Sequence, residues 1–236
     1  RCTMYLSAAI GATSLLAFFV FVYSGPFGFF QLGRTPGAAL AFDAGLSFGI
    51  FLQHSGMIRV RFRAWLARWV PDYLHGAAFA IASGVVLFSV VLLWQDSGRV
   101  LAEASGAFRV LLRVVFLLST VGIAWAAFSL PFFDTFGQRA IAYRLRGRTP
   151  RPTKLLVHGP YRWSRHPQYF FILLMIWSHP TLTWDRMLFN VLWTAWIVLG
   201  TVLEERDLVD TLGDDYRKYQ RRVPMLVPWH RATLHA

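Results

Sequence analysis

Long runs of apolar residues constrain the fold of this chain more than any other feature of its sequence. Residues 4–23 contain no charged side chain, and at about 1.5 Å per residue in a helix they can cross a bilayer. Comparable apolar segments lie at 37–58, 74–94, 108–130, 169–177 and 187–203. This pattern predicts an all-α fold, a polytopic transmembrane helical bundle with about five to six membrane segments.

The charge balance has two interpretations, and the apolar segments decide between them. Lys and Arg number 24 against 12 Asp and Glu, which gives a formal net charge of +12. Such a basic chain could bind nucleic acid, or its cations could lie in cytoplasmic loops that face anionic lipid. Because 56% of the residues are hydrophobic and only 15% charged, we expect membrane lipids as partners and no nucleic acid.

The distribution of charge between the loops predicts the orientation. Loops 59–73 and 132–166 are rich in Lys and Arg, whereas loops 24–36 and 95–107 carry little net positive charge. The positive-inside rule then places both termini and both basic loops in the cytoplasm, and we expect the inner membrane of a bacterium. This orientation requires residues 169–203 to enter and return as a hairpin, whose first arm is short enough to be tilted or partly re-entrant.

A basic loop rich in turn formers precedes that hairpin, between His158 and Tyr169. Pro167 is suited to the first turn of a helix, and the free N–H groups of such a turn, with Arg165 and His166, can bind an anion. Aromatic rings that could hold a flat ring or a cation are Tyr161, Trp163 and Tyr169. The alternative is an ordinary basic loop with aromatic residues at the membrane interface.

Two adjacent carboxylates, Glu204 and Glu205, end the last apolar run. Carboxylates oppose the dipole at a helix C-terminus, so a partner such as Arg206, a loop arginine or a ligand ammonium group is expected. Adjacent helix positions point about 100° apart, so one glutamate could bind a ligand while the other pairs with an arginine. An anion site, a carboxylate and aromatic rings together suit S-adenosylmethionine, a zwitterion with an aromatic ring.

The same residues resemble the integral-membrane methyltransferase superfamily of isoprenylcysteine carboxyl and phospholipid methyltransferases. The shared motif positions are Gly159, Pro160, Tyr161, Arg162, Arg165, His166, Pro167, Tyr169, Glu204, Glu205, Tyr216, Tyr219, Val223 and Pro224. They cover about the last third of the chain. Phe171 departs from the pattern, because the superfamily usually has glycine there, and this puts the packing beside the cofactor in question.

The resemblance implies a cofactor site at the cytosolic face, with the acceptor entering from the membrane. The predicted S-adenosylmethionine contacts are His158, Gly159, Tyr161, Arg165, His166, Pro167, Tyr169, Glu204 and Glu205, and no metal is expected. We interpret 1–236 as one membrane domain, in which 1–131 forms the acceptor side and 132–236 binds the cofactor.

The front half is similar to a subgroup, the methanethiol S-methyltransferases and the related NnrU-type membrane proteins. The similarity lies in Phe51-Leu52-Gln53-His54-Ser55 and Phe133-Asp134-Thr135-Phe136-Gly137. An ionisable residue in a membrane segment is a functional hypothesis, so His54 is a candidate catalytic base and Asp134 a candidate partner that orients it. The alternatives are a packing histidine and a capping or arginine-paired carboxylate.

The function predicted from the sequence is S-adenosylmethionine-dependent S-methylation of a small apolar thiol, such as methanethiol to dimethyl sulfide. Two alternatives remain at this stage. One is methylation of a lipidic acceptor, an isoprenylcysteine carboxyl group or a phospholipid amine. The other is a non-enzymatic NnrU-like membrane protein.

Overall fold

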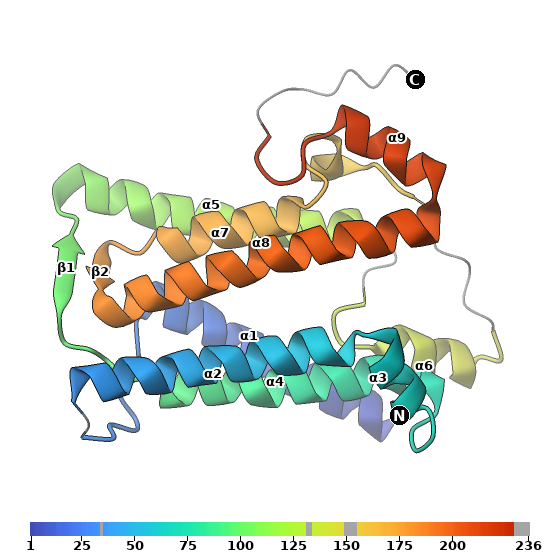
Figure 1. Cartoon of the computed structure of the whole chain (residues 1–236), viewed down its shortest axis with the longest axis horizontal. Helices are drawn as coiled ribbons and strands as arrows, with labels where there is room; N and C mark the ends of the chain where they lie inside the picture. Colours follow the sequence, from blue (N-terminus) through green and yellow to red (C-terminus); the bar gives the residue numbers. More distant parts are fainter. Residues whose placement is uncertain (34, 131–133, 149–154, 229–236) are drawn as a thin grey trace. The chain divides into compact units, whose positions relative to one another are not determined.

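The structure, a computed structural model, describes residues 1–33, 35–130, 134–148 and 155–228, and helices dominate them (Figure 1). The longer helices are α1 (Cys2–Ser24), α2 (Pro36–Met57), α4 (His75–Leu93), α5 (Gly106–Ser129), α7 (Pro167–Trp177) and α8 (Trp184–Leu212). Shorter helices are α3 (Val60–Leu66), η1 (Asp72–Leu74), α6 (Gln138–Leu145), η2 (Gly159–Arg162) and α9 (Asp214–Arg222).

The helical membrane fold predicted from the apolar segments is confirmed. Within the described residues, four helices are long and apolar enough to cross a membrane, at Cys2–Ser24, Asp72–Leu93, Gly106–Ser129 and Trp184–Leu212. Helix α2 corresponds to the predicted segment 37–58, and α7, with 11 residues, is the short first arm of the hairpin. The chain is an integral membrane protein.

Two short strands were not predicted. They are β1 (Val100–Glu103), in the polar link before α5, and β2 (Thr181–Thr183), between α7 and α8, and they pair in a two-stranded sheet. Four- and three-residue strands leave too little alternation in the sequence to be recognised. The pairing occupies backbone groups of both links.

The described chain groups into two compact units. The first contains Arg1–Leu101, Asp134–Arg151 and Thr183–Leu192, and the second contains Ala102–Phe133, Pro152–Leu182 and Trp193–Ala236. Both draw on separate stretches of the sequence, because α6 joins the first unit and α5 the second. The interpretation of 1–236 as one membrane domain stays a prediction.

In the first unit, α1 packs along α4, and α2 packs on α4 as well. Helices α1 and α4 can approach closely because Gly84 of α4 has no side chain. A Cβ there would lie 2.7 Å from Ile10 Cγ2 and 3.2 Å from Ser14 Oγ, both on α1. Near the other end of these helices, the rings of Phe21, Trp94 and Phe189 pack edge-on, with centroids 5.4–5.9 Å apart. Small residues and aromatic contacts therefore hold this unit together.

Two buried acids of the first unit accept hydrogen bonds from the link after α4. Asp43 is fully buried in α2, and its Oδ1 accepts a hydrogen bond of 2.9 Å from the backbone N–H of Gln95. Asp185, at the start of α8, accepts hydrogen bonds from the backbone N–H and the hydroxyl of Ser97. These acids tie the link after α4 to α2 and α8.

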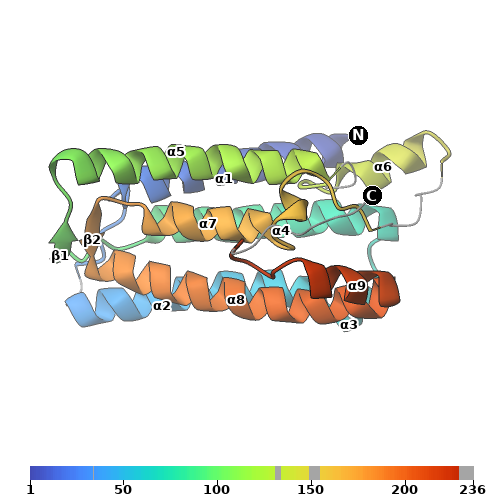
Figure 2. The same ribbon diagram turned by 90° about the horizontal axis from the view of Figure 1, so that it is seen from above.

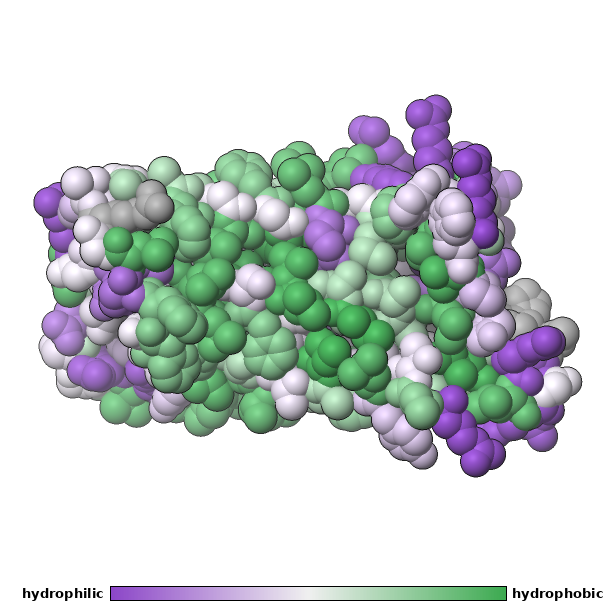
Figure 3. Space-filling view, turned by 90° about the horizontal axis from the view of Figure 1, so that it is seen from below, coloured by the Kyte–Doolittle hydropathy of each residue, from purple (hydrophilic) through white to green (hydrophobic). Residues whose placement is uncertain are grey.

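The second unit contains the elements around which the predicted cofactor residues gather. Helices α5 and α7 lie side by side (Figure 2), and η2 also packs on α5. Helix α8 from Trp193 onward, helix α9 and the loop after it complete the unit. Many apolar side chains on the helices remain exposed, such as Phe128 of α5 at 87%, and such apolar surfaces cover much of the face in Figure 3. In a membrane protein these surfaces face lipid.

Candidate functional site

The carboxylate of Glu205 is the centre of a buried hydrogen-bond network in the second unit. Oε1 accepts from Arg165 Nε at 2.8 Å, contacts His166 Nε2 at 2.8 Å and accepts from the Tyr216 hydroxyl at 2.7 Å. Oε2 accepts from Arg165 Nη2 at 2.8 Å and from Gln220 Nε2 at 2.6 Å. A carboxylate offers about four lone-pair sites, so these contacts fill its acceptor capacity.

Arg165 also binds the backbone beyond α9. Its Nη1 donates to the carbonyl oxygens of Gln220 and Val223, at 2.9 and 2.5 Å. The side chain is only 11% exposed. Arg165 was predicted to bind an anion, but the structure places its guanidinium on Glu205 and on these carbonyls, so it clamps α8 to the C-terminal end of α9.

The basic loop runs alongside the segment after α9. The backbone N–H groups of Arg165 and His166 donate to the carbonyl oxygens of Pro224 and Met225, at 2.9 and 3.0 Å. Ser164, buried and missed by the sequence analysis, also donates its hydroxyl to Met225 O. Val223 precedes a proline and is extended, which leaves the carbonyl groups of this segment free to accept. This explains the Val-Pro pair of the motif.

Two tyrosines of α9, Tyr216 and Tyr219, anchor the helix to the site. They are three residues apart, so they share one face of the helix, and both are buried. Tyr219 donates its hydroxyl to the carbonyl oxygen of Tyr161 at 2.5 Å, which fixes the turn of η2. Burial and the hydrogen bond to Glu205 raise the pKa of Tyr216, and burial, with the charge of Glu204, raises the pKa of Tyr161 to about 12. These phenols therefore stay neutral at physiological pH.

Glu204 differs from its neighbour in exposure and in its contacts. Its side chain is 45% exposed, and Oε2 accepts a hydrogen bond of 2.9 Å from the Tyr169 hydroxyl. His166 Nδ1 lies 3.8 Å from the same oxygen, and the His166 ring stacks on Tyr169 with centroids 5.6 Å apart and planes 8° from parallel. Glu204 is thus an accessible carboxylate held beside two stacked rings.

Gly159 sets the position of the loop against α5. Its φ of +55° lies in the left-handed region, and a Cβ there would overlap the hydroxyl of Ser129 and lie 3.1 Å from its Cβ. Trp163 packs edge-on against Trp125, one turn before Ser129 on α5, with centroids 5.3 Å apart. The loop is therefore seated on α5, with the exposed His158 before the turn and the buried Pro167 at the first position of α7.

The structure accounts for Phe171, which departs from the superfamily pattern. Its ring lies directly over Gly122 of α5, where a Cβ would come within 2.5–2.6 Å of three ring atoms. The residue without a side chain at this contact is therefore Gly122 on α5, not residue 171 on α7. The structure thus shows where the Phe171 ring packs, against a glycine that no motif had indicated.

The two proposed catalytic residues lie in the first unit. The His54 ring, on α2, meets the ring of Phe79 on α4 edge-on at a centroid distance of 4.8 Å. Asp134 accepts hydrogen bonds from the backbone N–H groups of Gln138 and Arg139, at 3.0 and 2.7 Å. It therefore caps α6, as one of the alternatives from the sequence proposed. Among the described residues, no group of three or more His, Cys, Asp or Glu side chains could hold a metal ion.

Comparison with known proteins identifies the family. Residues 107–214, which include the loop, α7 and the Glu pair, match the phospholipid methyltransferase family. Over 241 residues the chain is 33% identical to a methanethiol S-methyltransferase of Mycobacterium tuberculosis, with 97% of this chain and 99% of that protein covered. The chain belongs to the methanethiol S-methyltransferase family.

Two further relatives match over a smaller share of the chain. A methanethiol S-methyltransferase of Pseudomonas deceptionensis is 35% identical over 82% of this chain and 76% of its own length. Nurim of Homo sapiens is more distant, at 28% identity over 72% of this chain and 68% of that protein. No solved structure matches the chain.

Family membership makes the chain a membrane-embedded methyltransferase, and the recognition from the sequence is confirmed. Gln220 is the network residue that the sequence analysis missed. It stands one residue after Tyr219, outside the quoted motif, and only the fold brings it to Glu205.

Proposed function

We propose that this methyltransferase transfers the methyl group of S-adenosylmethionine to a small thiol such as methanethiol, which gives dimethyl sulfide. The observation that carries the proposal is the similarity, over 97% of the chain, to a protein named for this reaction. The site supports it with a carboxylate and aromatic rings suited to a zwitterionic cofactor. The acceptor is small, and the membrane would admit it.

Within the site, Glu204 is the proposed partner of the cofactor ammonium group. Glu205 has no acceptor capacity left, whereas Glu204 is 45% exposed and accepts one hydrogen bond, from Tyr169. The rings of Tyr161 and Tyr169 would flank the ligand, and the backbone around Gly159 would face its carboxylate. When bound, S-adenosylmethionine supplies a methyl group carried on a sulfonium.

The remaining predicted contacts act by holding this arrangement. Arg165 and His166 both bind Glu205, so their role is to fix the loop and the orientation of the Tyr169 ring. The residues thus fit the cofactor through one accessible carboxylate supported by a buried network. We propose that Arg165 acts as a positioning residue rather than as an anion ligand.

A thiol acceptor needs to lose its proton. Because thiols have pKa values of about 8.5 or more, a base assists at neutral pH, and we propose that the imidazole of His54 takes the proton. Asp134, which caps α6, would act on His54 only through the position of that helix. A thiolate that accepts a methyl group loses its charge, so a site poor in water favours the transfer.

N-methylation of a phospholipid is the second candidate, favoured by the match of residues 107–214 to the phospholipid methyltransferase family. A prenylcysteine carboxyl group is the third acceptor to be tested. The proposed orientation, with both termini in the cytoplasm of a bacterial inner membrane, gives the site access to cytosolic cofactor.

An acceptor panel tests the proposal on purified protein. S-Adenosylmethionine binding is measured by calorimetry, and the protein is then supplied with methanethiol, a prenylcysteine and phosphatidylethanolamine in turn. We expect cofactor binding and dimethyl sulfide in the headspace, and both should be reduced in Glu204→Gln. Methyl transfer to the lipid or the prenylcysteine but not to the thiol would replace the proposed acceptor, and absence of cofactor binding would reject the site.

A further inference from the structure

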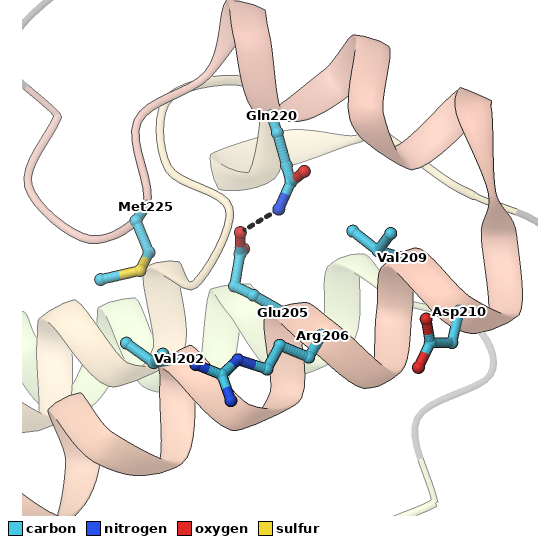
Figure 4. A pocket seen from close by; sticks show the side chains of 7 residues that line it. All are labelled: Val202, Glu205, Arg206, Val209, Asp210, Gln220 and Met225. Carbon is cyan, nitrogen blue, oxygen red and sulfur yellow. Dashed lines mark hydrogen bonds between the residues drawn. The ribbon is translucent and has the colours of Figure 1, made fainter.

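A hollow of about 390 Å³ opens beside the last turns of α8, next to the Glu205 network (Figure 4). Its apolar walls are Val202 and Val209 of α8 and Met225 of the loop after α9. Polar side chains at the hollow are Arg206, Asp210 and Gln220. Glu205 borders it too, but the acceptor capacity of that carboxylate is filled by the network described above. Gln220 is uncharged and donates to Glu205, so the charged groups left to bind a ligand are Arg206 and Asp210.

Arg206 and Asp210 carry opposite charges but do not pair. They stand four residues apart, a spacing at which an ion pair can form on a helix. In the described part of the chain neither side chain has an ion-pair or hydrogen-bond partner, and both residues are exposed. Figure 4 shows the Arg206 side chain running back along α8 towards Val202, whereas Asp210 lies further along the helix, past Val209. A cation and an anion are therefore available separately.

The order of these groups along α8 follows the depth of the membrane. The apolar run of α8 ends at residue 203, so Val202 lies at the boundary of the hydrocarbon. Arg206 is about one turn further out and Asp210 about two turns, at about 1.5 Å per residue. Because the Arg206 side chain runs back towards Val202, the hollow presents a cation next to its apolar surface and, further outward, an anion (Figure 4). A phospholipid presents a glycerol with acyl chains, then a phosphate, then its headgroup.

We propose that this hollow binds one bilayer phospholipid whose headgroup carries a hydrogen-bond donor beyond the phosphate. Arg206 binds the phosphate, because guanidinium groups form paired hydrogen bonds with phosphate oxygens. Asp210 accepts from the headgroup donor, an ammonium group in phosphatidylethanolamine or a hydroxyl in phosphatidylglycerol. The start of the acyl chains lies against Val202 and Met225. Phosphatidylcholine has no such donor and binds more weakly.

Lipid retention measures this selectivity directly. The protein is reconstituted in nanodiscs of equal parts phosphatidylethanolamine, phosphatidylglycerol and phosphatidylcholine, and the lipids it retains on release are counted by native mass spectrometry. We expect one retained phospholipid per chain, with phosphatidylcholine under-represented relative to at least one of the others. The preferred lipid identifies the donor as ammonium or hydroxyl. Retention of all three in equal amounts contradicts the proposal.

Charge-neutral variants assign the site. In Arg206→Gln the affinity for every phospholipid falls by roughly tenfold, as for the loss of a charge-assisted contact. In Asp210→Asn retention persists, but the discrimination against phosphatidylcholine is lost. Arg217→Gln and Asp207→Asn are the matched controls, because these side chains do not line the hollow, and both should retain lipid as the wild type does. If Arg206→Gln and its control behave alike, the lipid is held elsewhere and the proposal is wrong.

Discussion

The guanidinium of Arg165 meets the carboxylate of Glu205 through two hydrogen bonds, each 2.8 Å long, from Nε and Nη2. Only 11% and 9% of the two side chains are exposed. Because Arg165 also holds the carbonyl oxygens of Gln220 and Val223, this pair joins the basic loop, the end of α8 and the segment after α9. The site depends on this ion pair for its shape.

Arg165→Lys should therefore be severe although it keeps the charge. An ammonium group cannot reproduce the two parallel hydrogen bonds, and breaking a buried pair costs about 3–5 kcal/mol. We expect a lower free energy of unfolding and loss of S-adenosylmethionine binding, measured by denaturation in detergent and by calorimetry. The matched control is Arg217→Lys, whose pair with Asp214 is exposed and contributes at most about 1 kcal/mol. Equal effects of Arg165→Lys and Arg217→Lys would show that the site does not depend on the Arg165–Glu205 ion pair.

Substitutions of Glu204 and Glu205 should have different effects, the first on S-adenosylmethionine binding and the second on the stability of the fold. Glu204→Gln removes an accessible charge, so S-adenosylmethionine affinity should fall by about 10- to 100-fold, the cost of a charge-assisted hydrogen bond, while unfolding stays close to wild type. Glu205→Gln, in contrast, should lower stability, because four donor side chains lose their shared anion. Calorimetry and thermal denaturation on both variants give the comparison. Unchanged affinity in Glu204→Gln would exclude it as the ammonium ligand.

His54→Ala tests the proposed base. Loss of general-base assistance should lower kcat at neutral pH by about 10²- to 10⁴-fold and leave S-adenosylmethionine binding intact. His54→Phe keeps an aromatic ring against Phe79, so it controls for packing and should be as slow as the alanine variant. Turnover is followed by dimethyl sulfide release between pH 6 and 9. Wild-type rates in the alanine variant would show that another group, or solvent, takes the proton.

Gly159→Ala should destabilise the loop through both its backbone and its packing. A side chain at φ +55° costs about 1–3 kcal/mol, and its Cβ would also overlap Ser129 on α5. We expect a reduced melting temperature and weaker S-adenosylmethionine binding. Gly45→Ala is the control, because nothing lies within 4 Å of a Cβ at that helical position, and it should be neutral or stabilising by up to about 1 kcal/mol. A stable, fully binding Gly159→Ala protein would contradict the close approach of loop and helix.

Because the phenol of Tyr216 is buried, we expect the free energy of unfolding to decrease at alkaline pH. Burial and its hydrogen bond to Glu205 raise its pKa above the ordinary value of 10.0. Above about pH 10 the unfolded state loses this proton while the folded state keeps it, so the free energy of unfolding decreases as the pH rises. The contribution of the neutral phenol is fully present below about pH 10.

Tyr216→Phe isolates this effect. The variant should be about 1–3 kcal/mol less stable at neutral pH, because Glu205 loses a donor, and its stability should fall less steeply between pH 9 and 11. Thermal denaturation over this range provides the slopes. Tyr5→Phe, at an exposed position, should follow the wild type. Parallel slopes for Tyr216→Phe and the wild type would show that other groups govern the alkaline transition.

Much of this protein is determined by sequence alone. The apolar segments fix the helices, because only helices satisfy the backbone inside a bilayer, and α1, α2, α4, α5 and α7 agree closely with the predicted ranges. The motif between His158 and Pro224 contains most of the residues that the structure gathers around Glu205. Its glycine and prolines act through local backbone geometry, which the sequence carries directly.

The division of roles at the site was decided only by the tertiary structure. From the sequence, Glu204 and Glu205 were equivalent, and Arg165 was as suited to a ligand as to a carboxylate. Their helix positions differ by about 100°, and this rotation turns Glu205 towards donors from the basic loop and from α9, while Glu204 stays accessible. Likewise, Phe171 is explained only by Gly122, which lies 49 positions earlier in the sequence and directly beneath its ring. Contacts between residues so far apart depend on how the helices pack, and no local pattern encodes them.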